Sequence, residues 1–283
     1  MQQGLSDEQR RVRFDKETLA RVSSLVAVQG EEVLGAVYWQ AEPNQTAQVW
    51  IPRCVPEAAS KWEPDEVEAV SLALLEAADA QAIRAELDLA QAVLNDERFE
   101  QDKALLEKAG YRHLADLLYL ASTPEMMPSS PPESPLEFEP YEETEYERLA
   151  GLVEATYQGT LDCPALNGVQ SIDTVLDGYR KVGRFRPQHW RFIRHEGHDI
   201  GCLLLAEHPA QSLFELVYMG LVPDARGKGW GSDVACFAQW MTHAAGSSHL
   251  VVAVDAANTP AIHAYEQAGY ISWDRRVVYV KVF

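Results

Sequence analysis

Residues 214–232 read FELVYMGLVPDARGKGWGS, an apolar run followed by a Pro-Asp turn and three glycines at alternate positions. The pattern predicts a strand, a loop and then a helix that continues beyond Ser232. Glycines at 227, 229 and 231 allow successive backbone N–H groups to point to one side, which makes an anion-binding concavity. Because this concavity opens a helix, it lies at the positive end of the helix dipole. The stretch therefore predicts a site for a diphosphate.

Three nucleotide-binding loops are compatible with a glycine-rich turn, and their spacing separates them. The sequence contains no G-x-x-x-x-G-K-[ST] string, which excludes a Walker A loop. The dinucleotide fingerprint G-x-G-x-x-G fails at its third glycine, because Ser232 or Val234 stands at that place. The pattern R-x-x-G-x-G is satisfied by Arg226, Gly229 and Gly231. An ordinary glycine-rich turn is the remaining alternative.

A second motif follows at the expected distance along the chain. Residues 258–270 read NTPAIHAYEQAGY, directly after an apolar strand predicted over residues 249–254. Together the two motifs resemble the GNAT superfamily of N-acyltransferases, and the resemblance covers roughly residues 136–283. The tandem arrangement described below is similar to that of mycothiol synthase-like proteins.

The resemblance implies which residues bind acetyl-CoA, the expected acyl donor. The glycine loop would hold the diphosphate with two auxiliary cations, residues 219–221 would offer backbone groups to the pantetheine arm, and an amide would contact that arm beside a small residue. Gly220 interrupts an apolar strand, which predicts a bulge or a close backbone approach. The expected donor-binding residues are Met219, Gly220, Leu221, Arg226, Gly227, Lys228, Gly229, Trp230, Gly231, Ser232, Asn258 and Ala261.

Two residues are candidate catalysts. Glu215 stands in an otherwise apolar strand, so desolvation is expected to raise its pKa, and we predict that it is the general base. Tyr265 is the candidate general acid toward the leaving thiolate, because the resemblance places its helix beside the cofactor sulfur. A solvated carboxylate and a packing tyrosine are the structural alternatives. Because no residue stands out as an acyl-carrying nucleophile, although Cys163 is a weak candidate, direct transfer in a ternary complex is expected.

The chain looks like an internal duplication with a proline-rich linker. Residues 124–135 contain the linker, which separates a predicted domain 1–123 from a predicted domain 136–283. The expected fold class is α/β (α+β), with two tandem GNAT-like domains that each have a mixed, mostly antiparallel sheet flanked by helices. Predicted elements of the first domain include helices over 7–20, 64–78 and 96–108.

The first domain lacks the features that the second one has. Aligning Val55-Pro56 on Val222-Pro223 puts Gln48 at the place of Glu215, and no glycine lies between residues 56 and 70. Aligning Gly110 on Gly269 puts Leu106 and Phe99 at the places of Tyr265 and Asn258. We therefore predict a structural or regulatory first domain without catalysis, with unrecognised acyl-CoA binding as the alternative.

Composition restricts the partners. The chain has 283 residues and a formal net charge of −19, which argues against nucleic-acid binding and favours a neutral or cationic acceptor. The four cysteines are scattered without metal-ligand spacing, so no metal is expected. No apolar stretch of transmembrane length occurs, so a cytoplasmic protein that binds no membrane is predicted.

The sequence thus predicts an acyl-CoA-dependent N-acetyltransferase that acts on a small-molecule amine or a peptide N-terminus. A binding protein that senses acyl-CoA without turnover is the alternative, and the pairing of Glu215 with Tyr265 favours the enzyme. In the GNAT fold the loop between the first helices lines the acceptor side, so Tyr157, Asp162 and Trp190 are substrate-contact candidates by position alone. Ordinary loop and packing roles are the alternative for these residues. Nothing in the sequence identifies the acceptor or the oligomeric state.

Overall fold

The computed structural model describes residues 22–56, 62–94 and 98–283. The first half contains β1 (Ser23–Gln29), β2 (Glu32–Ala41), β3 (Thr46–Val49), β4 (Arg53–Cys54), α3 (Pro64–Arg84), β5 (Leu89–Leu94), α4 (Phe99–Lys108) and β6 (Arg112–Ser122). The second contains β7 (Glu137–Pro140), α5 (Tyr146–Tyr157), α6 (Ile172–Lys181), β8 (Trp190–His195), β9 (His198–His208), β10 (Leu213–Leu221), α7 (Trp230–Ala244), β11 (His249–Asp255), α8 (Thr259–Gln267) and β12 (Ile271–Val282).

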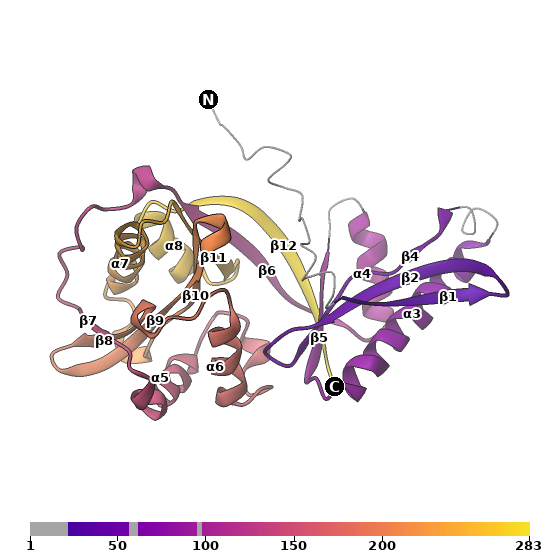
Figure 1. Cartoon of the computed structure of the whole chain (residues 1–283), viewed down its shortest axis with the longest axis horizontal. Coiled ribbons are helices and arrows are strands. Elements are labelled where there is room, and N and C mark those ends of the chain that lie inside the picture. The colour runs from indigo at the N-terminus through magenta and orange to yellow at the C-terminus, as the bar shows by residue number, and fades with distance from the viewer. Residues whose placement is uncertain (1–21, 57–61, 95–97) are drawn as a thin grey trace.

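The strands of both halves join one mixed sheet, where the sequence predicts two. Its order is β1-β2-β3-β5-β12-β6-β11-β10-β9-β8-β7, and β4 pairs with β2 off this path. Each half receives the long strand of the other: β12 lies between β5 and β6, and β6 lies between β11 and β12. Figure 1 shows β6 and β12 running side by side from one lobe to the other. The two exchanged strands are long, with 11 residues in β6 and 12 in β12.

Helices cover both faces of the sheet in the second half. On β9, Leu203 and Leu205 pack against α7 and α8, whereas Cys202 and Leu204 pack against α5 and α6. This alternation follows from the pleat, which points successive side chains to opposite faces. The continuous apolar sequence of β9 is therefore explained by burial on both sides.

The core of the first half lies between α3, α4 and its own strands. Leu75 and Ala78 of α3 pack with Leu106 of α4 and with alternate residues of β3 and β5. Tyr279 of β12 belongs to the same core, because the exchanged strand completes this part of the sheet. Each core therefore depends on residues from the opposite end of the chain.

The predicted elements agree with the structure except at several boundaries. Helix α3 continues to Arg84, six residues beyond its predicted end. Strand β12 begins at Ile271, whereas the sequence pattern predicts a strand over residues 277–283. The helix predicted over residues 7–20 lies outside the described residues, as does the predicted start of α4 at Asp96. Within the described ranges, no helix is long and apolar enough to cross a membrane.

Candidate active site

The site begins where two parallel neighbours in the sheet separate. Strands β10 and β11 are paired only from Leu213 to Glu215 and from His249 to Val251. Beyond these positions β10 stays paired with β9 and β11 stays paired with β6. The facing edges of residues 216–221 and 252–254 border a pocket of about 480 Å³, which we call the wedge pocket. Backbone groups on such edges are available to a ligand.

The glycine loop and the start of α7 close one end of the wedge pocket. Gly227 and Gly229 adopt φ values of 74° and 82°, a left-handed conformation that glycine adopts without strain. Gly229 is the N-cap of α7 and supplies no side chain to the free N–H groups of the first helical turn. The predicted donor-binding residues that line this pocket are Met219, Gly220, Leu221, Arg226, Gly227, Gly229, Trp230, Gly231, Ser232, Asn258 and Ala261.

Lys228 is the one predicted donor-binding residue outside that lining. Its ammonium lies over the Trp230 ring, 4.6 Å from the ring centroid. Its predicted contact with a diphosphate stays a prediction.

Helix α8 forms a second wall of the wedge pocket. The Asn258 side chain caps this helix by accepting a hydrogen bond from the Ala261 N–H at 3.3 Å. One turn later, Tyr265 lines the pocket but is only 4% exposed. Burial and, secondarily, the charge of Asp162 raise the pKa of Tyr265 well above its usual range, so its phenol keeps its proton at neutral pH.

The sequence predicts a bulge or a close backbone approach at Gly220, and the structure has both of these features at two different residues. The bulge lies at Val217, because Leu216 pairs with Leu205 while Tyr218 pairs with Leu204. Gly220 itself is a place of close approach, since an added Cβ would lie 2.7 Å from the hydroxyl oxygens of Thr156 and Tyr218. Thr156 donates to the Val153 carbonyl at 2.6 Å, so the Tyr218 hydroxyl donates to Thr156 at 2.7 Å.

Arg226 binds protein carbonyls with its guanidinium. Nε donates to the carbonyl of Leu221 at 2.9 Å, and Nη2 donates to that of Thr156 at 2.6 Å. Nη1 donates to the carbonyls of Gln158 and Gly159 at 2.8 and 3.0 Å. These bonds cap the C-terminal end of α5 and fasten the loop after it to the end of β10. The predicted contact of Arg226 with a diphosphate stays a prediction.

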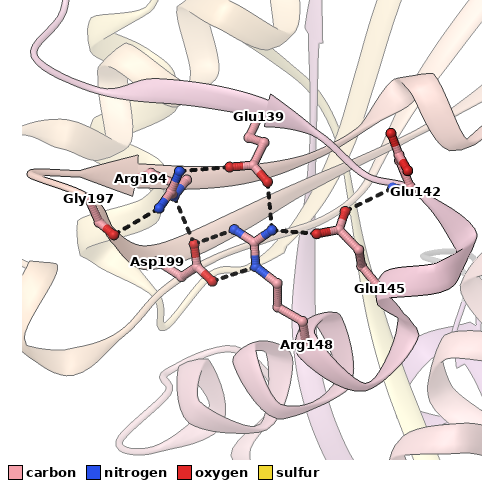
Figure 2. A network of polar contacts seen from close by, with 7 residues as sticks. All are labelled: Glu139, Glu142, Glu145, Arg148, Arg194, Gly197 and Asp199. Atoms are coloured by element: carbon pink, nitrogen blue, oxygen red, sulfur yellow. Dashed lines mark hydrogen bonds and ion pairs between the residues drawn. The ribbon is translucent and has the colours of Figure 1, made fainter.

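The other end of α5 is fixed by a network of charges. Figure 2 shows the Arg148 guanidinium between Glu139 of β7, Glu145 and Asp199 of β9, with N–O distances of 2.6 to 2.7 Å. Arg194 joins Glu139 to Asp199 from the other side. The arginines lower the pKa of the Glu139 and Asp199 carboxyls, with Arg148 as the larger cause. Anchoring α5 at both ends fixes the loop that borders the site.

A second pocket of about 600 Å³ lies on the α5 and α6 side of β10, and we call it the lobe pocket. It shares Thr160, Asp162, Val217 and Tyr218 with the wedge pocket. Its remaining lining comes from both halves of the chain: Glu42, Pro43, Asn44, Gln91, Tyr157, Cys163, Leu166, Asn167, Gly168, Gln170, Val175, Gly178, Tyr179, Lys181 and Val182.

The first half reaches the lobe pocket through the turn after β2. Asn44 lies so close to Gly178 of α6 that an added Cβ on the glycine would be 2.6 Å from the Asn44 Cβ. The Gln170 amide donates to the Asn44 carbonyl and, at 3.2 Å, to Asp88. Oδ1 of Asn44 is buried and has no hydrogen-bond partner among the described residues. Surrounding atoms close this oxygen off from the pocket, although other parts of Asn44 line it.

Three tyrosines form one side of the lobe pocket. The Tyr179 and Tyr218 rings stack with centroids 5.5 Å apart, and the Tyr157 ring meets Tyr218 edge-on at 5.7 Å. Burial raises the pKa of all three phenols. Neutral aromatic rings in this arrangement suit an organic cation or an aromatic group.

Asp162 lies at the junction of the two pockets. Its side chain is exposed to the space inside the pockets, but protein surrounds that space. This desolvation raises the pKa of Asp162, and the charge of Asp255 adds to the effect. Oδ1 accepts the Asp255 N–H at 3.1 Å, while Oδ2 of Asp255 accepts the Cys163 N–H at 3.2 Å. The two aspartates thus lock the loop to the end of β11.

Glu215 and Trp190 lie differently from what the sequence predicts. Glu215 is not desolvated: its side chain is 41% exposed and pairs with His208 at 3.0 Å. It occupies the last paired position of β10 and lines neither pocket. Trp190 is only 1% exposed and packs between Tyr141 and Phe185, so it is a core residue and not a substrate contact.

Sequence reasoning missed the contribution of the first half to the site. Asn44 and Gln91 stand in segments without a motif, and only the folded chain brings them to α6. Tyr179 and Tyr218 are visible in the sequence as aromatic residues. Nothing in the sequence distinguishes them from the other aromatic residues that pack inside a folded domain. The sequence predicts Asp162 as a substrate-contact candidate. Its contact with Asp255 cannot be predicted in the same way, because it depends on where β11 ends in the folded chain.

Comparisons with known proteins agree with this geometry. Residues 134–270 match the model of the acetyltransferase (GNAT) family. A stretch of 97 residues is 32% identical to a mycothiol acetyltransferase of Arthrobacter sp. (strain FB24), and it spans 34% of this chain but only 27% of that relative.

Solved structures resemble nearly the whole chain. A GCN5-related N-acetyltransferase from Sphaerobacter thermophilus aligns with 92% of this chain and 80% of its own at 18% identity and a TM-score of 0.62. One from Kribbella flavida aligns with 92% and 90% at 14% identity and a TM-score of 0.53. At these identities the likeness shows a mixed α/β GNAT fold. With the family match, it makes residues 134–270, just under half of the chain, similar to an acetyltransferase domain of the GNAT family.

Proposed function

We propose that this protein is an N-acetyltransferase that moves the acetyl group of acetyl-CoA to a primary amine in a ternary complex. The observation that carries the proposal is the contact between two pockets, one with a glycine loop and one with an aromatic wall, across four shared residues. Two substrates held on either side of such a junction can react without an enzyme-bound acyl group.

The wedge pocket suits the acyl donor. The left-handed glycines and the uncapped N-terminus of α7 offer N–H groups to a diphosphate. The unpaired edge of β10 beyond Glu215 offers backbone groups to the amide-containing pantetheine arm. When bound, acetyl-CoA would supply the acetyl group as a reactive thioester. Tyr265, which keeps its proton in this environment, is the proposed proton donor to the thiolate.

The lobe pocket suits the acceptor. Tyr157, Tyr179 and Tyr218 provide a surface for an ammonium group, and Asp162 provides a carboxylate beside it. Asn44 and Gln91 add polar groups for the remainder of the molecule. A small-molecule amine or a peptide N-terminus fits this chemistry.

Direct transfer is favoured over a cysteine-bound acyl group. Burial, with added repulsion from Asp162 and Asp255, raises the pKa of the Cys163 thiol to about 12. A thiol of this kind holds its proton at neutral pH and is a poor nucleophile.

We further propose that the chain consists of two GNAT-like halves and that only the second reacts. Residues 1–123 would form a degenerate half that completes the acceptor pocket, residues 124–135 a linker, and residues 136–283 the catalytic half. The wall that Asn44 and Gln91 give to the lobe pocket supports a structural role for the first half.

The test is a screen of primary amines with the purified chain and acetyl-CoA, with released thiol as the readout. We expect thiol release that depends on both substrates, with intersecting initial-rate plots and one acetyl-CoA bound per chain in calorimetry. Binding without thiol release for every amine would favour a sensor of acyl-CoA. Parallel initial-rate plots, typical of an acyl-enzyme, would contradict direct transfer.

A further inference from the structure

We propose that Asp162 is the residue that takes the proton from the acceptor amine, in place of Glu215. The inference rests on the proposed acetyl transfer and assigns one of its steps. Among the described residues, Asp162 is the one carboxylate that lines both the wedge pocket and the lobe pocket. An amine that approaches from the lobe pocket toward a thioester in the wedge pocket must pass this junction.

The loop geometry holds one carboxylate oxygen and leaves the other available. Oδ1 of Asp162 accepts the Asp255 N–H, which fixes the side chain against β11. Asp255 is only 4% exposed, and its two oxygens accept the N–H groups of Cys163 and Ala257. Asp255 is therefore occupied by the backbone, whereas Asp162 faces the pockets.

The groups around Asp162 favour a base stronger than an ordinary aspartate. Asp255 faces it from β11, the Cys163 thiol follows it in the loop, and Tyr157, Tyr218 and Tyr265 face it from α5, β10 and α8. Burial and the Asp255 charge raise the pKa of the Asp162 carboxyl, which brings it closer to the pH at which a base must work.

Glu215 lacks these features. Its carboxylate is paired with the imidazole of His208 at 3.0 Å. Its side chain is 41% exposed, and neither pocket includes it. Glu215 is therefore not part of the junction at which the amine and the thioester would meet.

The proposed step conserves every proton. The acceptor ammonium gives one proton to Asp162, and the lone pair of the neutral amine then attacks the thioester carbon. The C–N bond forms and the C–S bond breaks, with its electron pair leaving on sulfur. Tyr265 gives its proton to the thiolate and takes the second proton from nitrogen. Asp162 returns its proton to water, and the products are an amide and a thiol.

The charge of Asp162 affects the ionisation of Tyr265, and this coupling sets the order of the two proton transfers. The negative charge of Asp162 contributes to the raised pKa of Tyr265. Protonation of Asp162 removes this charge, so Tyr265 ionises more readily when the thiolate leaves. Proton uptake by Asp162 thereby makes proton release by Tyr265 easier.

The experiment compares Asp162→Asn with the wild type on tyramine, putrescine, glucosamine and a tripeptide, with acetyl-CoA affinity measured in parallel. The amide oxygen of asparagine can still accept the Asp255 N–H, so the loop is kept while the base is lost. We expect turnover to fall by on the order of 10²-fold or more, an unchanged acetyl-CoA dissociation constant, and loss of the rise of rate with pH. Asp65→Asn, an exposed site in the first half, changes the net charge equally and should leave turnover unchanged.

Three outcomes would overturn the proposal. Equal turnover of Asp162→Asn and wild type would remove Asp162 from proton transfer and leave the acetyltransferase standing. A loss confined to Glu215→Gln would return the role to that residue. Carbon-13 NMR of the aspartate carboxyls, with Asp162 identified by its absence in the variant, gives a test without an acceptor. Titration of Asp162 at or below about 3.9, the ordinary aspartate value, would contradict a raised basicity. Absence of thiol release from the wild type with every amine would instead reject the proposed function.

Discussion

The two halves of the chain place different residues across the same gap between strand and helix. In the second half, Gly220 of β10 and Ala261 of α8 line the wedge pocket. Alignment of the two Val-Pro pairs puts Arg53 at the place of Gly220, and alignment of Gly110 with Gly269 puts Asp102 at the place of Ala261. Arg53 and Asp102 form a bidentate ion pair with N–O distances of 3.1 and 2.7 Å. The ion pair joins β4 to α4 where the second half has two small residues.

The helices that follow these strands also begin differently. Helix α7 starts at a left-handed glycine with no side-chain cap. Helix α3 starts with Pro64, and its first turn carries Asp65 and Glu66. Glu66 accepts the Glu63 N–H at 3.0 Å, so this N-terminus supplies its own acceptor and a negative field. The comparison teaches that anion binding needs free N–H groups and also open space beside them.

The largest expected effect comes from giving the second half the acid of the first. Ala261→Asp should weaken acetyl-CoA binding by on the order of 10²-fold, because it puts a carboxylate into the wedge pocket where a diphosphate-bearing ligand is expected. An acid in the first turn of α8 is compatible with the helix dipole, so folding should be kept. Calorimetry measures the affinity, and Ala261→Asn, which has the same shape without the charge, is the control.

The reverse exchange sharpens the comparison. The double variant Arg53→Gly with Asp102→Ala opens the gap in the first half, and we expect the stoichiometry to remain one acetyl-CoA per chain. The reason is that the self-capped, acidic start of α3 is unchanged. A second binding event in the titration would mean that the ion pair alone closes the first half.

A smaller effect is expected from the wall that the first half gives to the lobe pocket. Asn44→Ala shortens a side chain that lines the lobe pocket beside Gly178, and it should raise the KM for the acceptor by about threefold to tenfold, as expected for the loss of one polar contact. The acetyl-CoA dissociation constant should not change, because Asn44 lies outside the wedge pocket. Steady-state kinetics with one identified amine measure both quantities. An unchanged acceptor KM would restrict the first half to structural support.

Arg226 tests the attachment of the α5 loop, a feature without a described counterpart in the first half. Arg226→Lys keeps the charge but loses the planar fork that reaches the carbonyls of Leu221, Thr156, Gln158 and Gly159. We expect the free energy of unfolding to fall by about 2 kcal/mol. Urea denaturation measures it, with the exposed Arg112→Lys as the control. A parallel loss of acetyl-CoA affinity that exceeds the loss of stability would restore the predicted diphosphate contact.

The smallest expected effect is the acid dependence of the Arg148 network. The pKa values of Glu139 and Asp199 are lowered in the folded state, so the stability they contribute is present at neutral pH. It is lost as the pH falls from about 5 through the ordinary carboxyl range and below. Arg148→Gln should flatten this part of the curve of unfolding free energy against pH. The exposed Lys181→Gln, which breaks a solvent-exposed pair with Asp177, should leave the slope unchanged.

The sequence predicts the second half in most of its detail because local patterns determine it. The strand, loop and helix over residues 214–244 follow from apolar periodicity, proline and glycine placement, and the pocket lining includes nearly every predicted donor-binding residue. Asn258 and Tyr265 are assigned through the resemblance of residues 258–270 to the GNAT closing motif, and both line the wedge pocket. In these cases the neighbours along the chain are also neighbours in space.

Features that depend on contacts between residues far apart along the chain cannot be predicted from the sequence. Glu215 reads as desolvated because its strand is apolar, but the pairing with His208 comes from the register of β9. Trp190 is assigned to the acceptor side by position in the chain, while Tyr141 and Phe185 enclose it. No pattern in the sequence predicts the exchange of β6 and β12, because both strands have the composition of an ordinary partly buried strand.

The exchanged strands impose an order on folding during synthesis. During synthesis β5 is made well before β12, the strand that pairs with it in the sheet. Until then β5 and β6 present unpaired edges, which are templates for wrong pairing with other chains. The sheet of the first half therefore cannot be completed until β12 of the second half has been made.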